Sequence, residues 1–327
     1  MQTRRMFLTS LALAATFGNV ERAPAQVYPS HPITMIVPFP AGGPVDAIGR
    51  IVAESMRASL GRPVIIENVS GASGSIGTGR VAHATPDGYT FGIGHLGTHV
   101  FNGVAYPLPY DLLNDFEPVS LLVTNPLLIV ARKTMPAKDL QELIAWLKAN
   151  PGKASQGTSG VGGTSEVAGI FFQKETGTRF QLVPYRGAAA MMQDLLAGQI
   201  DLMIDFAANS LSQVRAGTIK AYAVTAPSRL PAAPDIPTVD EAGLGGFYIS
   251  AWQGIWVPKG TPKDVIGKLN AAIVAALADS LVRRRLADLG QEIYPRDQQT
   301  PEALGELQRA EIKKWWPIIR AVGIKAE

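Results

Sequence analysis

The stretch VPFPAGGPVDAIGRIVAESMR, residues 37–57, decides the fold class of this chain. It leaves a short apolar run, passes through Gly42 and Gly43, and continues with apolar residues at helical spacing. A strand, a glycine loop and a helix start in this order present backbone N–H groups to an anion. Asp46 stands where an N-cap is expected. A tight turn with a capping aspartate has the same pattern, so this loop alone leaves both interpretations open.

The alternation of strands and helices continues along the chain in two blocks. In each block we expect a mainly parallel sheet with helices on both faces, because short apolar runs alternate with helical patterns. In the first block the expected strands are ITMIV, PVIIEN and YTFGIG, and the expected helices span 45–60 and 75–84. In the second block the expected helices span 137–149, 164–176 and 188–197, and the strands 181–186, 199–206 and 219–225.

Two unusually long β-rich runs bracket the second block, at 116–132 and 248–257. Each is long enough to leave one sheet and enter another, which predicts two α/β lobes joined by two strands. We expect lobe 1 at 26–126 and 251–327 and lobe 2 at 127–250. A cleft between such lobes is a natural ligand site, and the paired strands can act as a hinge. One large sheet, with both runs as core strands, is the alternative.

The first 25 residues have the organisation of an export signal. Arg4 and Arg5 precede an apolar run at 6–17, which is too short to span a bilayer, and Ala23-Pro24-Ala25 matches an A-x-A cleavage site. The string TRRMFL is also typical of a twin-arginine signal, although paired arginines occur in general secretory signals too. We therefore expect a signal peptide at 1–25 and a mature protein in the periplasm that does not span the membrane.

The composition limits the kinds of partner and chemistry. The chain has 327 residues, enough for two domains, and it has no cysteine, which excludes disulfides and thiolate chemistry. Its net charge of +3 is small, and no run of Lys and Arg suggests a nucleic-acid surface. We expect a monomer that binds no nucleic acid and needs no cofactor.

Four further glycine-rich loops stand at the carboxyl ends of predicted strands, where open α/β sheets bind ligands. They cover residues 71–77, 92–99, 157–165 and 185–188. If the helix starts that follow them converge on one cleft, they hold a carboxylate with neutral donors. The alternative is that all of these loops are merely short connections between strands and helices.

Two sequence motifs invite other functions. Residues 92–97 fit G-x-G-x-x-G, but a dinucleotide site needs a helix directly after it, and Pro107 and Pro109 argue against one. His95 and His99 are four residues apart, yet the sequence places no third metal ligand. We therefore expect these histidines to make hydrogen bonds and the chain to hold neither a nucleotide nor a metal.

Three side chains leave a choice of roles. Ser159, His99 and Asp205 could assemble as a Ser-His-Asp triad in space, but nothing in their spacing favours it, so we expect no enzyme activity. Arg186 can pair with a ligand carboxylate or form a surface ion pair. Asp205 ends an apolar strand, where a buried acid needs a partner, either a ligand donor or neighbouring backbone N–H groups.

Several motifs in a fixed order resemble the Bug family, the TctC-like solute-binding proteins of tripartite tricarboxylate transporters. The resemblance covers essentially the whole mature chain. It rests on VPFPAGGPVDAIGR, IENVSGASGSIG, VAHATPDGYTFGIG with THVFN, GTSGVGGTSEVAG, VPYRGAAAMMQDLLAGQID, IKAYAVTAPSR with PDIPTVDEAG, and WQGIWVPKGTP.

This resemblance implies a type II periplasmic-binding-protein fold that closes on a small carboxylate and delivers it to membrane transporter subunits. A sensory binder on the same fold is the alternative, and a secreted hydrolase is less favoured. Carried over by position, the ligand-binding residues are Phe39, Ala41, Gly42, Gly43, Asp46, Thr98, His99, Ser159, Gly163, Thr164, Ser165, Tyr185, Arg186, Gly187 and Asp205. Val45 departs from the family, which often has Thr or Ser there, so one hydroxyl donor is lost and the identity of the carboxylate stays open.

Overall fold

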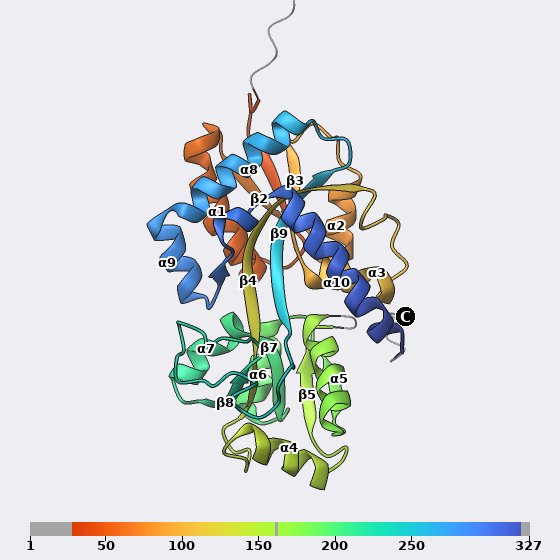
Figure 1. Ribbon diagram of the computed structural model, residues 1–327, viewed down its shortest axis with the longest axis vertical. Coiled ribbons are helices and arrows are strands. Elements are labelled where there is room, and N and C mark those ends of the chain that lie inside the picture. The colour runs from red at the N-terminus through yellow and green to blue at the C-terminus, as the bar shows by residue number, and fades with distance from the viewer. Residues whose placement is uncertain (1–27, 161–162, 322–327) are drawn as a thin grey trace, which may run out of the picture.

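The computed structural model describes residues 28–160 and 163–321. They form two α/β lobes, one above the other in Figure 1, with two long strands running between them. This is the two-lobe architecture that the sequence predicts. The predicted signal peptide at 1–25 lies outside the described residues.

Lobe 1 is built on a sheet with the order β2-β1-β3-β9-β4, and β10 pairs with β4. The first three strands are parallel, and β9 and β4 continue the sheet antiparallel. Helices α1, α8 and α9 share one hydrophobic core with this sheet, while α2 and α10 pack into another. The bounds are β1 Ile33–Val37, α1 Pro44–Leu60, β2 Val64–Asn68, α2 Ser75–Ala82, β3 Thr90–His95, β4 Phe116–Arg132, β9 Ser250–Pro258, α8 Lys263–Ala278, α9 Ser280–Asp288, β10 Glu292–Ile293 and α10 Pro301–Ala321.

Lobe 2 uses the far half of β4 in a second sheet with the order β8-β4-β7-β5-β6. Strands β5, β6 and β7 are parallel to each other, and both β7 and β8 are antiparallel to β4. Strand β5 was not among the strands expected from the sequence. The bounds are α4 Leu140–Ala149, β5 Ser155–Thr158, α5 Thr164–Thr176, β6 Gln181–Pro184, α6 Ala188–Ala197, β7 Leu202–Phe206, α7 Ala207–Arg215 and β8 Ile219–Val224.

The long strand β4 belongs to both sheets. Its residues up to Pro126 pair with β9, and its residues from Leu127 onward pair with β7 and β8. A continuous hydrogen-bonded path therefore crosses from one lobe to the other, although the sheet turns where β4 changes partners. The lobe boundaries expected at 126/127 and 250/251 stay a prediction.

Some local predictions were wrong, each for a local reason. The helix expected from 137 begins at Leu140, because the carboxylate of Asp139 accepts the N–H of Glu142 and caps it. A π-helical turn, Gly97–Phe101, and α3, Asn102–Ala105, directly follow the glycine motif at 92–97. The proline argument against a helix there was therefore wrong: Pro107 forces only its neighbour Tyr106 into an extended conformation.

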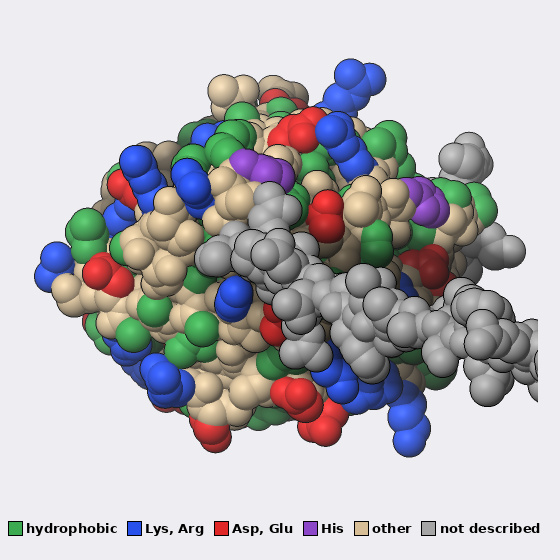
Figure 2. Space-filling model, turned by 90° about the horizontal axis from the view of Figure 1, so that it is seen from above, with side chains coloured by type: hydrophobic (Ala, Val, Ile, Leu, Met, Phe, Trp, Pro, Cys, Tyr) green, Lys and Arg blue, Asp and Glu red, His purple; other side chains and the backbone are tan. Residues whose placement is uncertain are grey.

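The face seen in Figure 2 shows how charge is distributed over the end of lobe 1. Lys and Arg side chains are interspersed with Asp and Glu, and small apolar patches lie between them.

Within residues 28–160 and 163–321, no single helix is long and apolar enough to cross a membrane. Helices α8 and α9, which meet at a 74° bend, reach the required length and composition only as a pair.

Thr225 ties together the two chain segments that enter lobe 2. Its buried hydroxyl donates to the carbonyl of Ile249 (2.6 Å) and accepts the N–H of Leu127 (3.0 Å). The backbone N–H of Thr225 donates to the Leu127 carbonyl, and its carbonyl accepts from Ile249. These residues adjoin the last pairs between β4 and β9, so Thr225 fixes the base of the connection.

Replacing this hydroxyl by a methyl group tests its contribution. Thr225→Val should lower the free energy of unfolding by about 1–3 kcal/mol, because it strands a buried N–H and a buried carbonyl. Urea denaturation followed by circular dichroism measures the change. Thr90→Val is the control, since the half-buried Thr90 hydroxyl has no hydrogen bond within the described chain. Equal effects of the two substitutions would contradict this role for Thr225.

Candidate functional site

A cleft of about 520 Å³ lies where loops of the two lobes meet. The first residues of three helices line it: Gly43 and Pro44 at α1, Gly163 and Thr164 at α5, and Gly187 and Ala188 at α6. The remaining lining residues are Phe39, Pro40, Ala41, Gly42, Val45, Ser73, His95, Gly97, Asn102, Ser159, Arg186, Ala189, Met192, Gln193, Leu196, Asp205, Phe206, Asn209 and Gln213. Helix starts from both lobes thus share one space.

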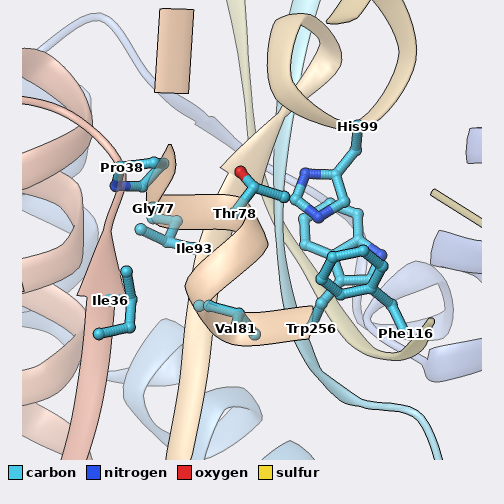
Figure 3. Close-up of a pocket in the computed structure, with 10 residues that line it drawn as sticks. Ile36, Pro38, Gly77, Thr78, Val81, Ile93, His99, Phe116 and Trp256 are labelled. Atoms are coloured by element: carbon cyan, nitrogen blue, oxygen red, sulfur yellow. The ribbon is translucent and has the colours of Figure 1, made fainter. Parts of the chain in front are cut away.

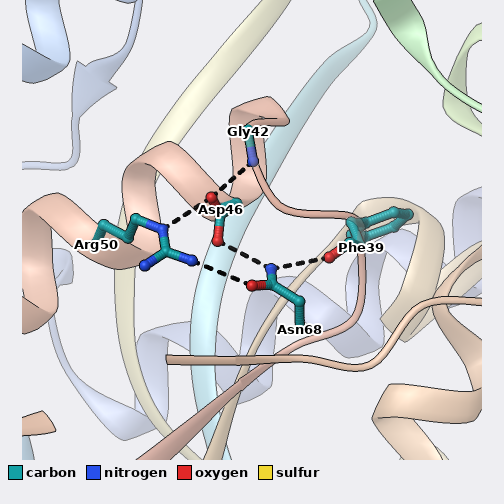
Figure 4. Close-up of polar contacts among 5 residues, drawn as sticks. All are labelled: Phe39, Gly42, Asp46, Arg50 and Asn68. Atoms are coloured by element: carbon teal, nitrogen blue, oxygen red, sulfur yellow. Dashed lines mark hydrogen bonds and ion pairs between the residues drawn. The ribbon is translucent and has the colours of Figure 1, made fainter. Parts of the chain in front are cut away.

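Asp46 shapes the first loop from behind the cleft wall (Figure 4). Its carboxylate accepts the N–H of Gly42 (2.8 Å), Nε of Arg50 (2.9 Å) and Nδ2 of Asn68 (2.9 Å). The Asn68 amide also donates to the carbonyl of Phe39, and so holds both ends of the loop. Gly43 is the N-cap and Asp46 lies inside the first turn, so the expectation that Asp46 is the N-cap was wrong. Pro44, pre-set for the first helical position, starts the helix three residues earlier than an N-cap at Asp46 would.

The same contacts keep Asp46 ionised. Burial alone raises the pKa of its carboxyl group, but hydrogen bonds from Arg50, Gly42 and Asn68 outweigh burial and lower the pKa below its ordinary value. Asp46 does not line the cleft, and its negative charge is already satisfied by protein donors. Asp46 therefore orients the segment 39–43 through its hydrogen bonds to Gly42 and Asn68.

The loop between β5 and α5 supplies hydroxyl groups from lobe 2. The Ser165 Oγ accepts the backbone N–H of Ser159 (2.7 Å) and lies 2.9 Å from its Oγ. Ser165 is buried behind the wall, whereas Ser159, Gly163 and Thr164 line the cleft. The Oγ1 of Thr164 is buried and has no hydrogen-bond partner in the described part of the chain.

The lobes approach each other closely at this end of the cleft. A methyl group added at Gly97 would lie 3.4 Å from Oγ1 of Thr164, and one at Gly160 would lie 3.4 Å from Oγ of Ser73. Ser73 also accepts a hydrogen bond from Asn102 Nδ2 at its carbonyl (3.0 Å). The structure therefore brings the loops at 71–77, 92–99 and 157–165 together, as the sequence predicts.

His95 is a neutral donor on this wall. Burial lowers the pKa of its imidazole to about 4. Its Nδ1 accepts the N–H of Gly97 (2.8 Å), which places the proton of the neutral ring on Nε2. The ring stacks on Phe39 of lobe 1, with centroids 5.0 Å apart, and meets Phe206 of lobe 2 edge-on at 6.2 Å. His95 is not among the ligand-binding residues predicted from the sequence.

Thr98 and His99 are buried and do not line the cleft. Burial, with a smaller contribution from His95, lowers the pKa of His99 to about 3. Its ring stacks on Trp256 at 3.7 Å beside a small internal cavity (Figure 3), and Nδ1 lies 2.9 Å from Oγ1 of Thr98. Thr98 also accepts the N–H of His95. These two residues support His95 from behind, and a direct role in ligand binding stays a prediction.

Two charged side chains line the cleft. Arg186 is exposed and forms no ion pair within the described residues, while the neighbouring Tyr185 donates to Asp194 (2.6 Å) instead of lining the space. Asp205 is 1% exposed, and burial raises its pKa to about 6 although Asn209 Nδ2 donates to it at 2.6 Å. Positive and negative charge thus occur once each in the lining.

Ten of the residues that the sequence assigns to the site line the cleft. They are Phe39, Ala41, Gly42, Gly43, Ser159, Gly163, Thr164, Arg186, Gly187 and Asp205. The five that do not are Asp46, Thr98, His99, Ser165 and Tyr185, and each of these supports a lining segment through a hydrogen bond or lies next to one. That any of the fifteen binds a ligand stays a prediction.

Several lining residues were not predicted from the sequence, among them Ser73, Asn102, Met192, Leu196 and Asn209. Ser73 lies in a glycine loop that the sequence did single out, and its positive φ of 50° marks a strained turn. The others lie inside helices, where only the tertiary structure shows which face meets the cleft.

Among the described residues, the candidate triad is not hydrogen-bonded and no metal-binding group is found. No hydrogen bond joins any two of Ser159, His99 and Asp205. Across the described residues, no group of three or more His, Cys, Asp or Glu side chains is placed to hold a metal ion. The cleft offers hydroxyls, side-chain amides, an imidazole N–H, one guanidinium and one carboxyl group as binding groups.

Fold and site together define a two-lobe solute-binding protein. The family model described as the tripartite tricarboxylate transporter family receptor, TctC, matches residues 48–324, and the chain belongs to this family. As the sequence motifs predict, it is a TctC-like, or Bug-type, protein.

Solved structures agree with this assignment. The periplasmic binding protein BugD is 40% identical, with a TM-score of 0.84 over 91% of this chain and 100% of its own. MatC from Rhodopseudomonas palustris, solved with bound malate, is 39% identical, with a TM-score of 0.83 over 89% of this chain and 100% of its own. Rpa4515 of the same organism, solved with adipate, is 32% identical, with a TM-score of 0.85 over 91% and 100%. The family and these neighbours are binding proteins rather than enzymes.

Neutralising Asp46 tests its role as the organiser of the first loop. Asp46→Asn should lower the free energy of unfolding at pH 7 by about 1–3 kcal/mol, because charge-assisted hydrogen bonds are lost. Since the folded state lowers the pKa of Asp46, its stabilisation is present above the ordinary carboxyl pKa of about 4 and is lost as pH falls below it. Denaturation curves between pH 7 and pH 3 should therefore converge for the wild type and the variant.

The control is Glu117→Gln, which neutralises a carboxylate in a surface pair with Lys259. Exposed pairs contribute at most about 1 kcal/mol, so this variant should change stability little. A stability loss in Asp46→Asn no larger than in Glu117→Gln would contradict the role of Asp46.

Proposed function

We propose that this protein is an extracytoplasmic solute-binding protein that captures a small carboxylate between its lobes. The observation that carries the proposal is the cleft itself, where the starts of α1, α5 and α6 and the hydroxyls of both lobes surround one space. Helix starts and neutral donors favour an anion. The malate and adipate bound by two structural neighbours support a carboxylate as that anion.

Closure follows from differential contact. A carboxylate held at the meeting point of the lobes bonds to Thr164 and Ser159 on one side and to groups near Ser73 and His95 on the other. The closed state then makes contacts that an open state lacks, so the ligand shifts the population toward closure. The lobe ranges 26–126 with 251–327 and 127–250 are the bodies that we propose to move, about the β4 and β9 connection.

Delivery to the membrane subunits of a tripartite tricarboxylate transporter is the role that family membership favours, with the mature protein located in the periplasm after removal of residues 1–25. A strain that lacks the protein should lose uptake of its carboxylate. Unchanged uptake with altered gene expression would favour the sensory alternative. Turnover of ester or amide substrates by the purified protein would favour a hydrolase and contradict a purely binding role.

Carboxylate binding is tested by a thermal-shift screen of mono-, di-, tri- and aromatic carboxylates. A ligand present at a hundred times its Kd should add about 2.7 kcal/mol to stability. Arg186→Gln should then weaken the best ligand about tenfold to a hundredfold, because a charge-assisted hydrogen bond is lost. Isothermal titration calorimetry measures the affinity.

The matched control is Arg179→Gln, on an exposed arginine of the same lobe that does not line the cleft. Its affinity should equal that of the wild type. If no carboxylate shifts the melting temperature, the proposed function is wrong. If Arg186→Gln and Arg179→Gln bind equally well, the carboxylate does not contact Arg186.

A further inference from the structure

The two ends of the cleft differ in chemistry. One end gathers the polar groups: Ser73 and Asn102 from lobe 1, and Ser159 and Thr164 from lobe 2. Oδ1 of Asn102 and Oγ1 of Thr164 are buried there without a hydrogen-bond partner among the described residues. The Thr164 hydroxyl can donate to a ligand carboxylate, whereas Oδ1 of Asn102 only accepts and needs a donor such as a ligand hydroxyl or a water molecule.

The loop that carries Arg186 belongs to this polar end. A methyl group at Gly160 would lie 4.0 Å from the carbonyl of Tyr185, the residue before Arg186. The chain that carries Arg186, the single cation of the described lining, therefore runs beside the loop that carries Ser159 and Thr164.

The rest of the cleft is mainly apolar, although the side-chain amides of Gln193, Asn209 and Gln213 also line it. Helix α6 contributes Ala188, Ala189, Met192 and Leu196, whose spacing of one, four and eight residues puts them on one helix face. Lobe 1 contributes Pro40, Ala41, Pro44 and Val45 to the same space, and Phe39 and Phe206 come from opposite lobes. Leu196 is 44% exposed, so its side chain offers apolar surface to a molecule in the cleft.

The charges argue against a second anionic group on the ligand. Among the described residues of the lining, only Arg186 and Asp205 are charged. A second carboxylate would lie against apolar side chains, among the neutral amides of Gln193, Asn209 and Gln213, or beside the buried Asp205. No described side chain of the lining supplies a second cation at any of these places, and an unpaired charge against apolar groups is costly.

We infer that the preferred ligand is a monocarboxylate with an apolar body, an alkyl chain or an aromatic ring, whose carboxylate binds at the polar end and whose body lies along α6. This inference rests on the proposed function and narrows it to one class of carboxylate. The volume of the cleft suits it, because pockets of roughly 300–1,000 Å³ enclose ligands well above the size of a four-carbon acid.

A chain-length series tests the inference by calorimetry at pH 7.5. Butanoate, hexanoate and octanoate are compared with succinate, adipate and suberate, the diacids of equal carbon number, and with benzoate and malate. Each added methylene should tighten the Kd of the monoacids about threefold to fourfold while the apolar wall is being covered. Each diacid should bind more weakly than the monoacid of the same length.

Leu196→Gln changes the polarity of the wall at nearly constant size, and it should flatten the dependence of affinity on chain length. Leu113→Gln is the matched control, because Leu113 is 42% exposed and does not line the cleft, and it should keep the wild-type dependence. Met192→Gln provides a second variant of the wall, and circular dichroism verifies that each variant is folded.

The outcomes separate this inference from the proposed function. If no acid of any series binds to the wild type, both are wrong. If malate or the diacids bind and the monoacids do not, or if affinity is independent of chain length, carboxylate capture stands and the apolar-body inference is overturned. Equal effects of Leu196→Gln and Leu113→Gln would also overturn it.

Discussion

The pairing of β4 with β9 is the constraint on which the rest of the structure depends. These strands run between the lobes in Figure 1, and β4 is a member of both sheets. Because the two segments are hydrogen-bonded to each other as far as Pro126 and Ser250, they restrict how one lobe can be placed against the other. Thr225 then ties Leu127 and Ile249 together at the point where lobe 2 begins.

This connection explains why a single cleft receives loops from distant parts of the sequence. The carboxyl ends of the parallel strands in both sheets face the space between the lobes, so the loops that follow β1, β2, β3, β5 and β6 converge there with the end of β7. The described lining contains few charged side chains, namely Arg186 and Asp205. The strongly charged groups, such as Asp46 with Arg50, stay behind the wall and position the main chain. A binding surface made this way depends on geometry more than on net charge.

The site has two layers of residues, one that lines the cleft and one behind it that holds the lining segments in place. Ser165, Thr98 and Asp46 hold segments whose neighbours line the cleft, so a substitution in the supporting layer moves several lining groups at once. Residues of the lining, such as Thr164 and Arg186, have free hydrogen-bonding capacity or charge that the protein does not use internally. This division is consistent with binding that is released by a small change in lobe placement.

The sequence by itself determined the local structure and its order: the alternation of strands and helices, the two long runs that became β4 and β9, and the glycine loops that begin α1, α5 and α6. These follow from short-range periodicity, turn chemistry and the family motifs, all of which are written within a few residues. Which side chains face the cleft was decided only by the tertiary structure. His95 and His99 stand in one loop, yet one lines the cleft and the other stacks on Trp256 in the core. Met192 and Leu196 likewise belong to an ordinary amphipathic helix until lobe 1 is placed beside it. Which side chains face the cleft depends on how the two lobes pack against each other. The packing residues are far apart in the sequence, so no local pattern contains that information.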